Sequence, residues 1–185
     1  MYKIENDTIR FSHNYDEPLS KNLLEIIRLN NINQLVFGMN FNQSLENLPS
    51  CIKTIIFKSF HYDCPLDNLS NGVETLKLSK FYDRNIDNLP LSVQTIYFGE
   101  FFNQKLDELP FTIKNLYFPI TGKFNKKLSN LPEGLETIFL PREYHRKFDN
   151  LPKNLKKIIV HQSYPYMDEL KKIVSKKDIL NTYIF

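Results

Sequence analysis

The side chains that most often carry chemistry are few in this sequence. Cys51, His61 and Cys64 form its one cluster of soft metal ligands. A structural zinc site needs four ligands, and the two cysteines fall at different positions of the repeat described below. The sequence has no P-loop, no dinucleotide-binding glycine pattern and no G-x-S-x-G nucleophile motif. We therefore expect no metal site, no cofactor and no nucleophilic active site.

Paired carboxylates are the other common catalytic arrangement. Asp67, Asp87 and Asp107 recur at one position of successive repeats. Two acid–base carboxylates need different environments that separate their pKa values, whereas residues in one column of a repeat share the same environment. We interpret these aspartates as solvated loop positions and predict that the protein is not an enzyme.

Positive charge is concentrated toward the C-terminus. The formal net charge is +3, but 13 Lys and Arg residues stand against 7 acids from Gly122 onward. Lys153, Lys156 and Lys157 lie near one another in this region and are the alternative binding site, for nucleic acid or another acidic surface. Acids interrupt this group, which argues against a nucleic-acid partner.

An internal repeat organises most of the chain. Six segments share an aromatic residue, an apolar residue four positions later and a Leu-Pro or Leu-Ser pair after that. The leading aromatics are 20 to 22 residues apart: Phe41, Tyr62, Tyr82, Phe102, Phe124 and Tyr144. Three apolar residues then follow at positions i, i+3 and i+5, as in Val93, Ile96 and Phe98, which is typical of a strand with one buried face.

The repeat predicts a leucine-rich-repeat-like solenoid. An earlier copy of the apolar triplet at Ile32, Leu35 and Phe37 brings the number of expected strands to about seven, in one parallel sheet with irregular return loops. No repeat can bury its apolar face alone, so neighbouring repeats must supply the walls of the core. The Asn or Asp after each leading aromatic is expected to satisfy loop backbone groups through local hydrogen bonds.

The pattern F-N-x-x-(I/L)-x-x-L-P-x-x-(L/I/V)-x-x-(L/I)-x-(F/L) resembles the FNIP repeat, a leucine-rich-repeat variant of slime moulds and of giant viruses of amoebae. The resemblance covers about residues 32–161, with Ser70 in place of the proline and His145 in place of the asparagine. It implies a protein-binding solenoid. In giant-virus members such repeats often follow an F-box that recruits ubiquitin-ligase machinery, and no F-box pattern precedes Phe41 here.

Both ends of the array are expected to be capped. We divide the chain into an N-terminal cap of a strand and a helix, the repeats, and a C-terminal cap of a helix and an apolar tail, at residues 1–31, 32–161 and 162–185. The first helix is expected to start near Asp16-Glu17-Pro18 and the second to run from Pro165 to Lys177. The apolar tail residues, Ile179-Leu180 and Tyr183-Ile184-Phe185, are expected to pack or to meet a partner.

The compartment follows from what the sequence lacks. No apolar run is long enough to cross a membrane, and no signal-peptide core follows the charged start. Two cysteines are too few for a disulfide framework. We expect a cytoplasmic protein without a membrane partner, in the host cytoplasm if the chain is viral.

The residues between the buried strand positions carry the functional prediction. Because side chains alternate between the two faces of a strand, these residues point to the open face of the sheet, where they form a column across the strands. Polar residues are expected on an open face, yet this column is mostly apolar. Its members predicted to bind a partner are Ile56, Tyr97, Tyr117, Phe139 and Ile159. Exposed aromatic area either marks an interaction site or stabilises the sheet by cross-strand stacking. We predict a non-catalytic protein-interaction solenoid that binds a partner protein, such as a host protein, or a second copy of itself.

Overall fold

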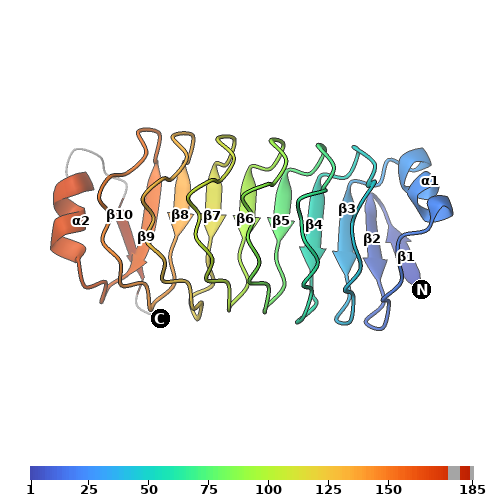
Figure 1. Ribbon diagram of the computed structural model, residues 1–185, viewed down its shortest axis with the longest axis horizontal. Helices are drawn as coiled ribbons and strands as arrows, with labels where there is room; N and C mark the ends of the chain where they lie inside the picture. The colour runs from blue at the N-terminus through green and yellow to red at the C-terminus, as the bar shows by residue number, and fades with distance from the viewer. Residues whose placement is uncertain (175–179, 184–185) are drawn as a thin grey trace.

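The computed structural model describes residues 1–174 and 180–183. Within these residues ten strands form one sheet, and each strand pairs with the next strand of the sequence (Figure 1). The strands are β1 (Tyr2–Glu5), β2 (Thr8–Phe11), β3 (Gln34–Phe37), β4 (Thr54–Phe57), β5 (Thr75–Lys77), β6 (Thr95–Tyr97), β7 (Asn115–Tyr117), β8 (Thr137–Phe139), β9 (Lys157–His161) and β10 (Leu180–Tyr183). The helices are α1 (Lys21–Leu29) and α2 (Met167–Val174).

The predicted fold class, a leucine-rich-repeat-like solenoid, is confirmed. Strands β3 to β9 come from the seven predicted repeats and pair in parallel, each joined to the next by an irregular return loop. The register aligns equivalent residues, so that Leu76 lies opposite Ile96, and Ile96 opposite Leu116, all three fully buried. Since a shift of one residue would expose this whole row, the buried positions fix the register.

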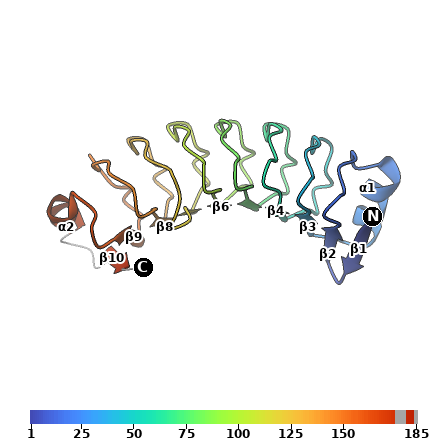
Figure 2. The same ribbon diagram turned by 90° about the horizontal axis from the view of Figure 1, so that it is seen from below.

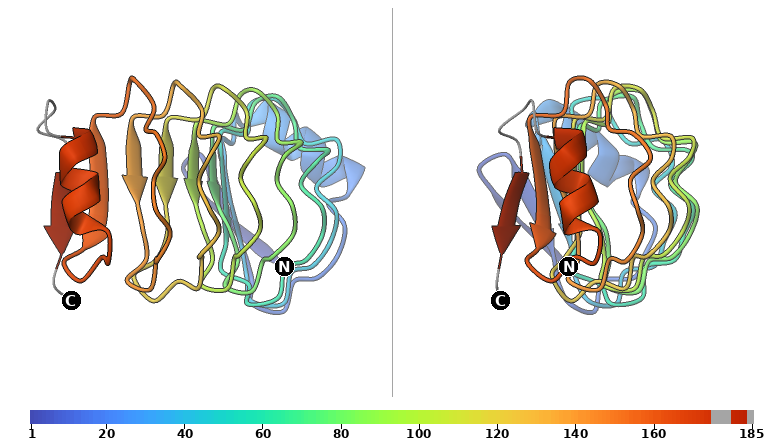
Figure 3. Two further views of the ribbon diagram at one scale, coloured as in Figure 1. Left: turned by 60° about the vertical axis from the view of Figure 1, so that its left-hand side comes forward. Right: turned by 90° about the vertical axis from the view of Figure 1, so that its left-hand side faces the viewer.

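The solenoid is curved, with its strands on the concave side and its return loops on the convex side (Figure 2). Seen along its axis, the chain winds in a coil that has the sheet as one wall and the loops as the others, and α2 lies across the C-terminal end of the coil (Figure 3). The face of the sheet that points away from the coil is therefore the inner surface of the arc.

The sheet extends beyond the repeats at both ends. β1 pairs antiparallel with β2 through a tight turn at Asn6, whose φ of 54° is a conformation that asparagine tolerates well. β10 adds in parallel to β9. Neither strand was predicted, because Lys3 and Glu5 interrupt the apolar pattern of β1, and the segment of β10 has only two large apolar residues.

The helices lie near the predicted positions but have different limits. α1 begins at Lys21, three residues after Pro18, because the Oγ atom of Ser20 accepts a hydrogen bond from the backbone N–H of Leu23 at 3.2 Å and caps the helix. α2 buries Leu170 and Val174. The predicted basic last turn at Lys176 and Lys177 lies outside the described residues, as do Ile179, Ile184 and Phe185.

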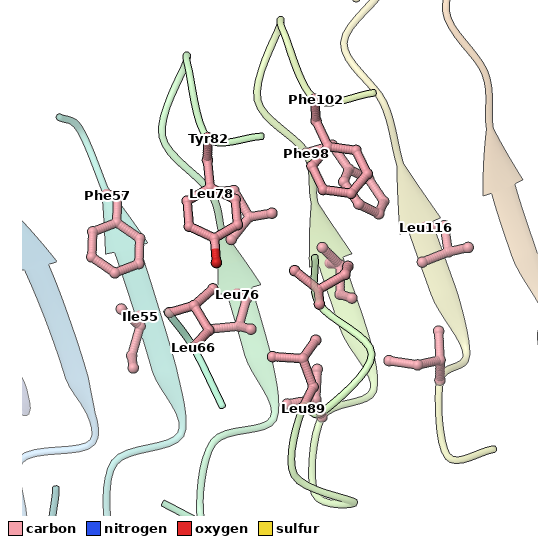
Figure 4. Packing of buried hydrophobic residues seen from close by; sticks show 14 of the residues in the cluster. Ile55, Phe57, Leu66, Leu76, Leu78, Tyr82, Leu89, Phe98, Phe102 and Leu116 are labelled. Atoms are coloured by element: carbon pink, nitrogen blue, oxygen red, sulfur yellow. The ribbon is translucent and has the colours of Figure 1, made fainter. Parts of the chain in front are cut away.

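The leading aromatics of the repeats form a stack inside the coil. Tyr62 stacks with Tyr82 at a centroid distance of 6.1 Å, and Phe102 stacks with Phe124 at 6.3 Å. Four of the six rings, Phe41, Tyr62, Phe102 and Phe124, also pack on the aromatic residue that ends the preceding apolar triplet; the Phe98 and Phe102 rings, for example, lie 4.7 Å apart (Figure 4). The aromatic column therefore joins successive repeats and also joins these loops to the sheet.

Some of these rings are tyrosines whose hydroxyls are buried without a hydrogen-bond partner among the described residues: Tyr62, Tyr82 and Tyr144. Burial raises the pKa of Tyr82 above its ordinary value, because the phenolate would lose its hydration. The hydroxyl is therefore a source of instability, since it loses hydrogen bonds to water that the folded chain does not replace.

Replacement of Tyr82 by phenylalanine, which the next repeat has at the equivalent position 102, is expected to leave the free energy of unfolding at pH 7 unchanged or to raise it by up to about 1 kcal/mol. The advantage should grow in alkali. Because folding raises the pKa of Tyr82, its pH-dependent contribution is unchanged below about pH 10, and the parent chain then loses stability as pH rises toward the folded pKa, since the unfolded chain ionises first. The phenylalanine variant has no such loss. Urea unfolding at pH 7 and near pH 11 would measure both effects. A variant less stable than the parent at pH 7 would contradict this account.

A ladder of side-chain oxygens runs along the loops beside the aromatic stack. The Oδ1 atom of Asn103 accepts a hydrogen bond from the backbone N–H of Asn125 at 3.0 Å, and the Oδ1 atom of Asn125 accepts one from His145 at 3.0 Å. The same bond joins Asp63 to Asn42 and Asn103 to Asp83. The expectation of local hydrogen bonds was wrong for these residues, because Asn42, Asp83, Asn103 and Asn125 bond to the backbone of the next repeat rather than to their own loop. Asp63 instead pairs with the Arg84 side chain of the next repeat.

Candidate functional site

The open, concave face of the sheet carries the predicted partner-binding residues. Strand register places Lys77, Tyr97, Tyr117 and Phe139 side by side, followed by Ile159 on β9. Tyr97 is 40% exposed, and the other apolar members are half-buried. We call the set Tyr97, Tyr117, Phe139 and Ile159 the concave column.

The two tyrosines of the concave column stack on each other. Their ring centroids lie 4.8 Å apart with an interplanar angle of 15°. Burial raises the pKa of Tyr117, with a further contribution from Tyr97. The stack stabilises the sheet, and it also leaves the exposed side of Tyr97 as a rigid aromatic surface that loses little side-chain entropy on binding.

Ile56 is separated from the rest of the predicted set. The register places it next to Lys77, whose exposed charged side chain lies between Ile56 and Tyr97. The other cross-strand neighbour of Ile56 is Val36, which is only 4% exposed. The structure thus brings together four of the five predicted residues as one continuous row.

Tyr183 joins this surface from the C-terminal strand. Its ring stacks on Phe139 at 5.0 Å, its edge meets His161 at 5.2 Å, and its hydroxyl donates a hydrogen bond to the Leu140 carbonyl at 3.0 Å. The expectation that the apolar tail packs is met at Tyr183, within the part of the tail that the structure describes. Sequence reasoning did not assign Tyr183 to the concave face, because no repeat pattern gives β10 a register.

The basic group predicted as the alternative site does not form a stripe of free cations. The Nζ atom of Lys156 forms an ion pair with Glu136 at 2.8 Å, and this hydrogen bond lowers the pKa of Glu136. The backbone N–H of Lys153 bonds to the carboxylate of Glu133 at 3.1 Å. Lys157 stands on β9, in the column next to Ile159. Acids on the preceding repeat therefore offset part of this positive charge.

The cysteines and histidine that could bind soft metals serve separate contacts. The Sγ atom of Cys51 lies 4.0 Å from the Ile27 carbonyl, and that of Cys64 lies 3.3 Å from the Asn42 carbonyl. The ring of His61 stacks on Phe81. Over residues 1–174 and 180–183, no group of three or more His, Cys, Asp or Glu side chains is placed to hold a metal ion.

A second exposed aromatic row lies on the loops that leave the strands. The rings of His61, Phe81 and Phe101 stack at centroid distances of 4.9 and 4.6 Å, and the ammonium group of Lys80 lies within 6 Å of both phenylalanine rings. Phe60 meets His61 edge-on. We call these residues the rim row. The signal for it was present in the sequence, as aromatic residues directly before Tyr62, Tyr82 and Phe102.

No helix among the described residues has the length and apolar character needed to span a membrane. No protein-family model matches this sequence, so the resemblance to the FNIP repeat stays a prediction. No curated protein matches it either.

One of the solved structures that match is the crystal structure of CroV588, described as a novel circular LRR protein structure. The match has a TM-score of 0.52 at 24% sequence identity and covers 88% of this chain. It spans only 32% of the CroV588 chain, so this chain corresponds to about a third of that protein's length. The similarity supports the leucine-rich-repeat fold.

Proposed function

We propose that the protein is a non-catalytic interaction solenoid that holds a partner protein against the concave column. The observation that carries the proposal is the aromatic row on the inner surface of the arc, where Tyr97 and Tyr117 are stacked and Tyr97 is 40% exposed. Aromatic residues are enriched at the centres of protein interfaces, because they bury much area with few rotatable bonds.

The concave shape supports the same role. A solenoid exposes one continuous inner surface, on which residues from several repeats contact one ligand. In this chain β6, β7, β8 and β9 each contribute one residue to the concave column. A partner that follows the curve would contact all of them at once.

Substitution of Tyr97, Tyr117 and Phe139 by threonine is expected to lower partner affinity tenfold or more, since loss of one hot-spot residue costs roughly 2 kcal/mol. The fold should survive, because threonine suits a strand and all three positions lie outside the coil. The measurement is quantitative capture of the partner from an extract of the native organism, with sedimentation of the purified chain to detect self-association.

The matched control reverses the charge of Lys153, Lys156 and Lys157 to glutamate and leaves the aromatics intact. Binding through the concave column should survive this change and respond weakly to salt, whereas binding through phosphate contacts weakens steeply as salt rises. Retained binding in the threonine variant together with lost binding in the charge-reversed variant would move the site to the basic group and refute the proposal.

A further inference from the structure

The C-terminal end of the concave face contains a cluster of contacts that suits one side-chain type. Phe139 offers a ring face, His161 meets a ring edge, and the Leu140 carbonyl accepts a hydroxyl hydrogen bond. A phenylalanine could use the first two contacts but not the third, and an aliphatic side chain could not stack. This combination recognises a tyrosine, and in the free chain Tyr183 occupies it.

The walls of this subsite belong to the repeats and not to the segment that fills it. Phe139 and Leu140 come from β8 and the residue after it, and His161 ends β9. Ser163 fixes the position of the His161 ring: the Nδ1 atom of His161 accepts a hydrogen bond from the backbone N–H of Ser163 at 3.2 Å and lies 2.6 Å from the Ser163 hydroxyl. These contacts of His161 and the strand pairing of Phe139 do not involve Tyr183.

The strand that carries Tyr183 is the least buried part of the sheet's C-terminal end. β10 has four residues, of which Asn181 and Thr182 are exposed and the outer two are half-buried. It pairs with β9 on one edge, and no described strand covers its other edge. By contrast, β8 pairs on both edges and carries the fully buried Ile138.

Tyr183 also leaves one polar group of the subsite unsatisfied. His161 is only 4% exposed, and its Nε2 atom has no hydrogen-bond partner among the described residues. A buried imidazole nitrogen without a partner is unfavourable, and this lowers the stability of the arrangement that Tyr183 completes.

From this geometry we propose that Phe139, Leu140 and His161 form a tyrosine-binding subsite, which Tyr183 fills in the free chain and which a tyrosine of an extended partner segment fills in the complex. The proposal rests on the proposed function and specifies the partner's chemistry: a tyrosine on a strand-like segment that takes the place of β10 beside β9. Addition of such a segment to a sheet edge gives affinity through backbone hydrogen bonds and specificity through a side-chain pocket.

The test uses the full chain with Tyr183→Ala and an acetylated, amidated peptide of sequence Leu-Asn-Thr-Tyr as the probe. Nuclear magnetic resonance of the isotopically labelled chain should show saturable shifts at Phe139, Leu140 and His161. The unsubstituted chain should bind the peptide at least about tenfold more weakly, because its own Tyr183 competes. A peptide ending in phenylalanine should bind about three- to tenfold more weakly than the tyrosine peptide, because it lacks the hydroxyl.

Two further variants serve as controls for this experiment. Addition of Phe139→Ala to Tyr183→Ala should abolish the shifts while the melting curve stays cooperative. If Tyr183→Ala alone unfolds, Tyr183→Phe keeps the ring, and this chain should bind the tyrosine peptide about three- to tenfold more tightly than the unsubstituted chain does. Equal binding to the variant and the unsubstituted chain, equal binding of both peptides, or shifts confined to other surfaces would each overturn the proposal.

The peptide-binding result can be distinguished from the result of the partner-capture test of the proposed function. The peptide experiment needs no natural partner, so the subsite stands or falls on the shifts alone. Peptide binding at the subsite, combined with partner capture that ignores the concave column, would refute the proposed function and the role of the partner's tyrosine, while the affinity of Phe139, Leu140 and His161 for tyrosine would stand.

Discussion

Replacement of Gly99 by alanine is expected to destabilise the folded chain by about 3 kcal/mol or more, because overpacking against immovable atoms is strongly unfavourable. A Cβ atom at Gly99 would lie 1.9 Å from the carbonyl oxygen of Ser79 and 2.9 Å from that of Lys80. Both atoms belong to the backbone of the preceding repeat, so the two coils would have to separate. Chemical denaturation, monitored by circular dichroism, measures the loss.

Whether Gly99→Ala lowers or raises the free energy of unfolding tests the close approach of the two repeats. Within the described residues no glycine has a positive φ, so alanine at Gly99 meets no dihedral strain. Without the close approach it would stabilise the chain by about 0.4–1 kcal/mol, since alanine restricts the unfolded state. A stabilised Gly99→Ala variant would contradict the close approach of the Ser79 carbonyl oxygen to Gly99. Glu100→Ala, which removes a surface ion pair with Lys80, is the neighbouring control and should cost less than about 1 kcal/mol.

Truncation of Phe102 to alanine is expected to destabilise the chain by roughly 3–5 kcal/mol. The ring is fully buried and contacts both Phe98 and Phe124, so its removal leaves a cavity between two repeats. Because contacts in a solenoid join neighbouring repeats, the unfolding transition should also become broader. Calorimetry would report both the lower midpoint and the change in cooperativity.

Phe101 provides the matched control for Phe102. It is the preceding residue with the same side chain, yet it is 38% exposed and belongs to the rim row. Phe101→Ala should cost less than about 1.5 kcal/mol, because it removes one exposed stacking contact and leaves no buried cavity. Similar losses for the two variants would mean that the leading aromatics are not the main contacts between repeats.

The sequence predicted the repeats and the concave column because both depend on local spacing. The residues of a triplet such as Val93, Ile96 and Phe98 all point into the coil, and the residue between the last two, Tyr97, points out of it, wherever the strand lies in space. Once the repeats are aligned, Tyr97 and Tyr117 must become neighbours. The same reasoning applied to the aromatics before the core rings would have found the rim row.

Other features depend on contacts that no local pattern encodes. The placement of Tyr183 against Phe139 joins residues far apart in the chain, through a strand that lies outside the repeat. Likewise, whether Asn103 bonds within its loop or to the next repeat depends on the distance between coils, which the spacing of residues does not reveal. The offset of Lys156 by Glu136 has the same origin, since the two residues meet only after neighbouring repeats have stacked.

The oxygen ladder on the loops has a consequence for how such a chain can change in length. Each rung needs only an acceptor side chain on one repeat and a backbone N–H on the next, as between Asn103 and Asn125. A tandem duplication of one repeat in the gene would therefore supply both halves of a new rung and a new ring for the aromatic stack. Lineages could gain or lose whole coils in single genetic events, and the reach of the concave surface would change in steps of one strand spacing, about 4.8 Å.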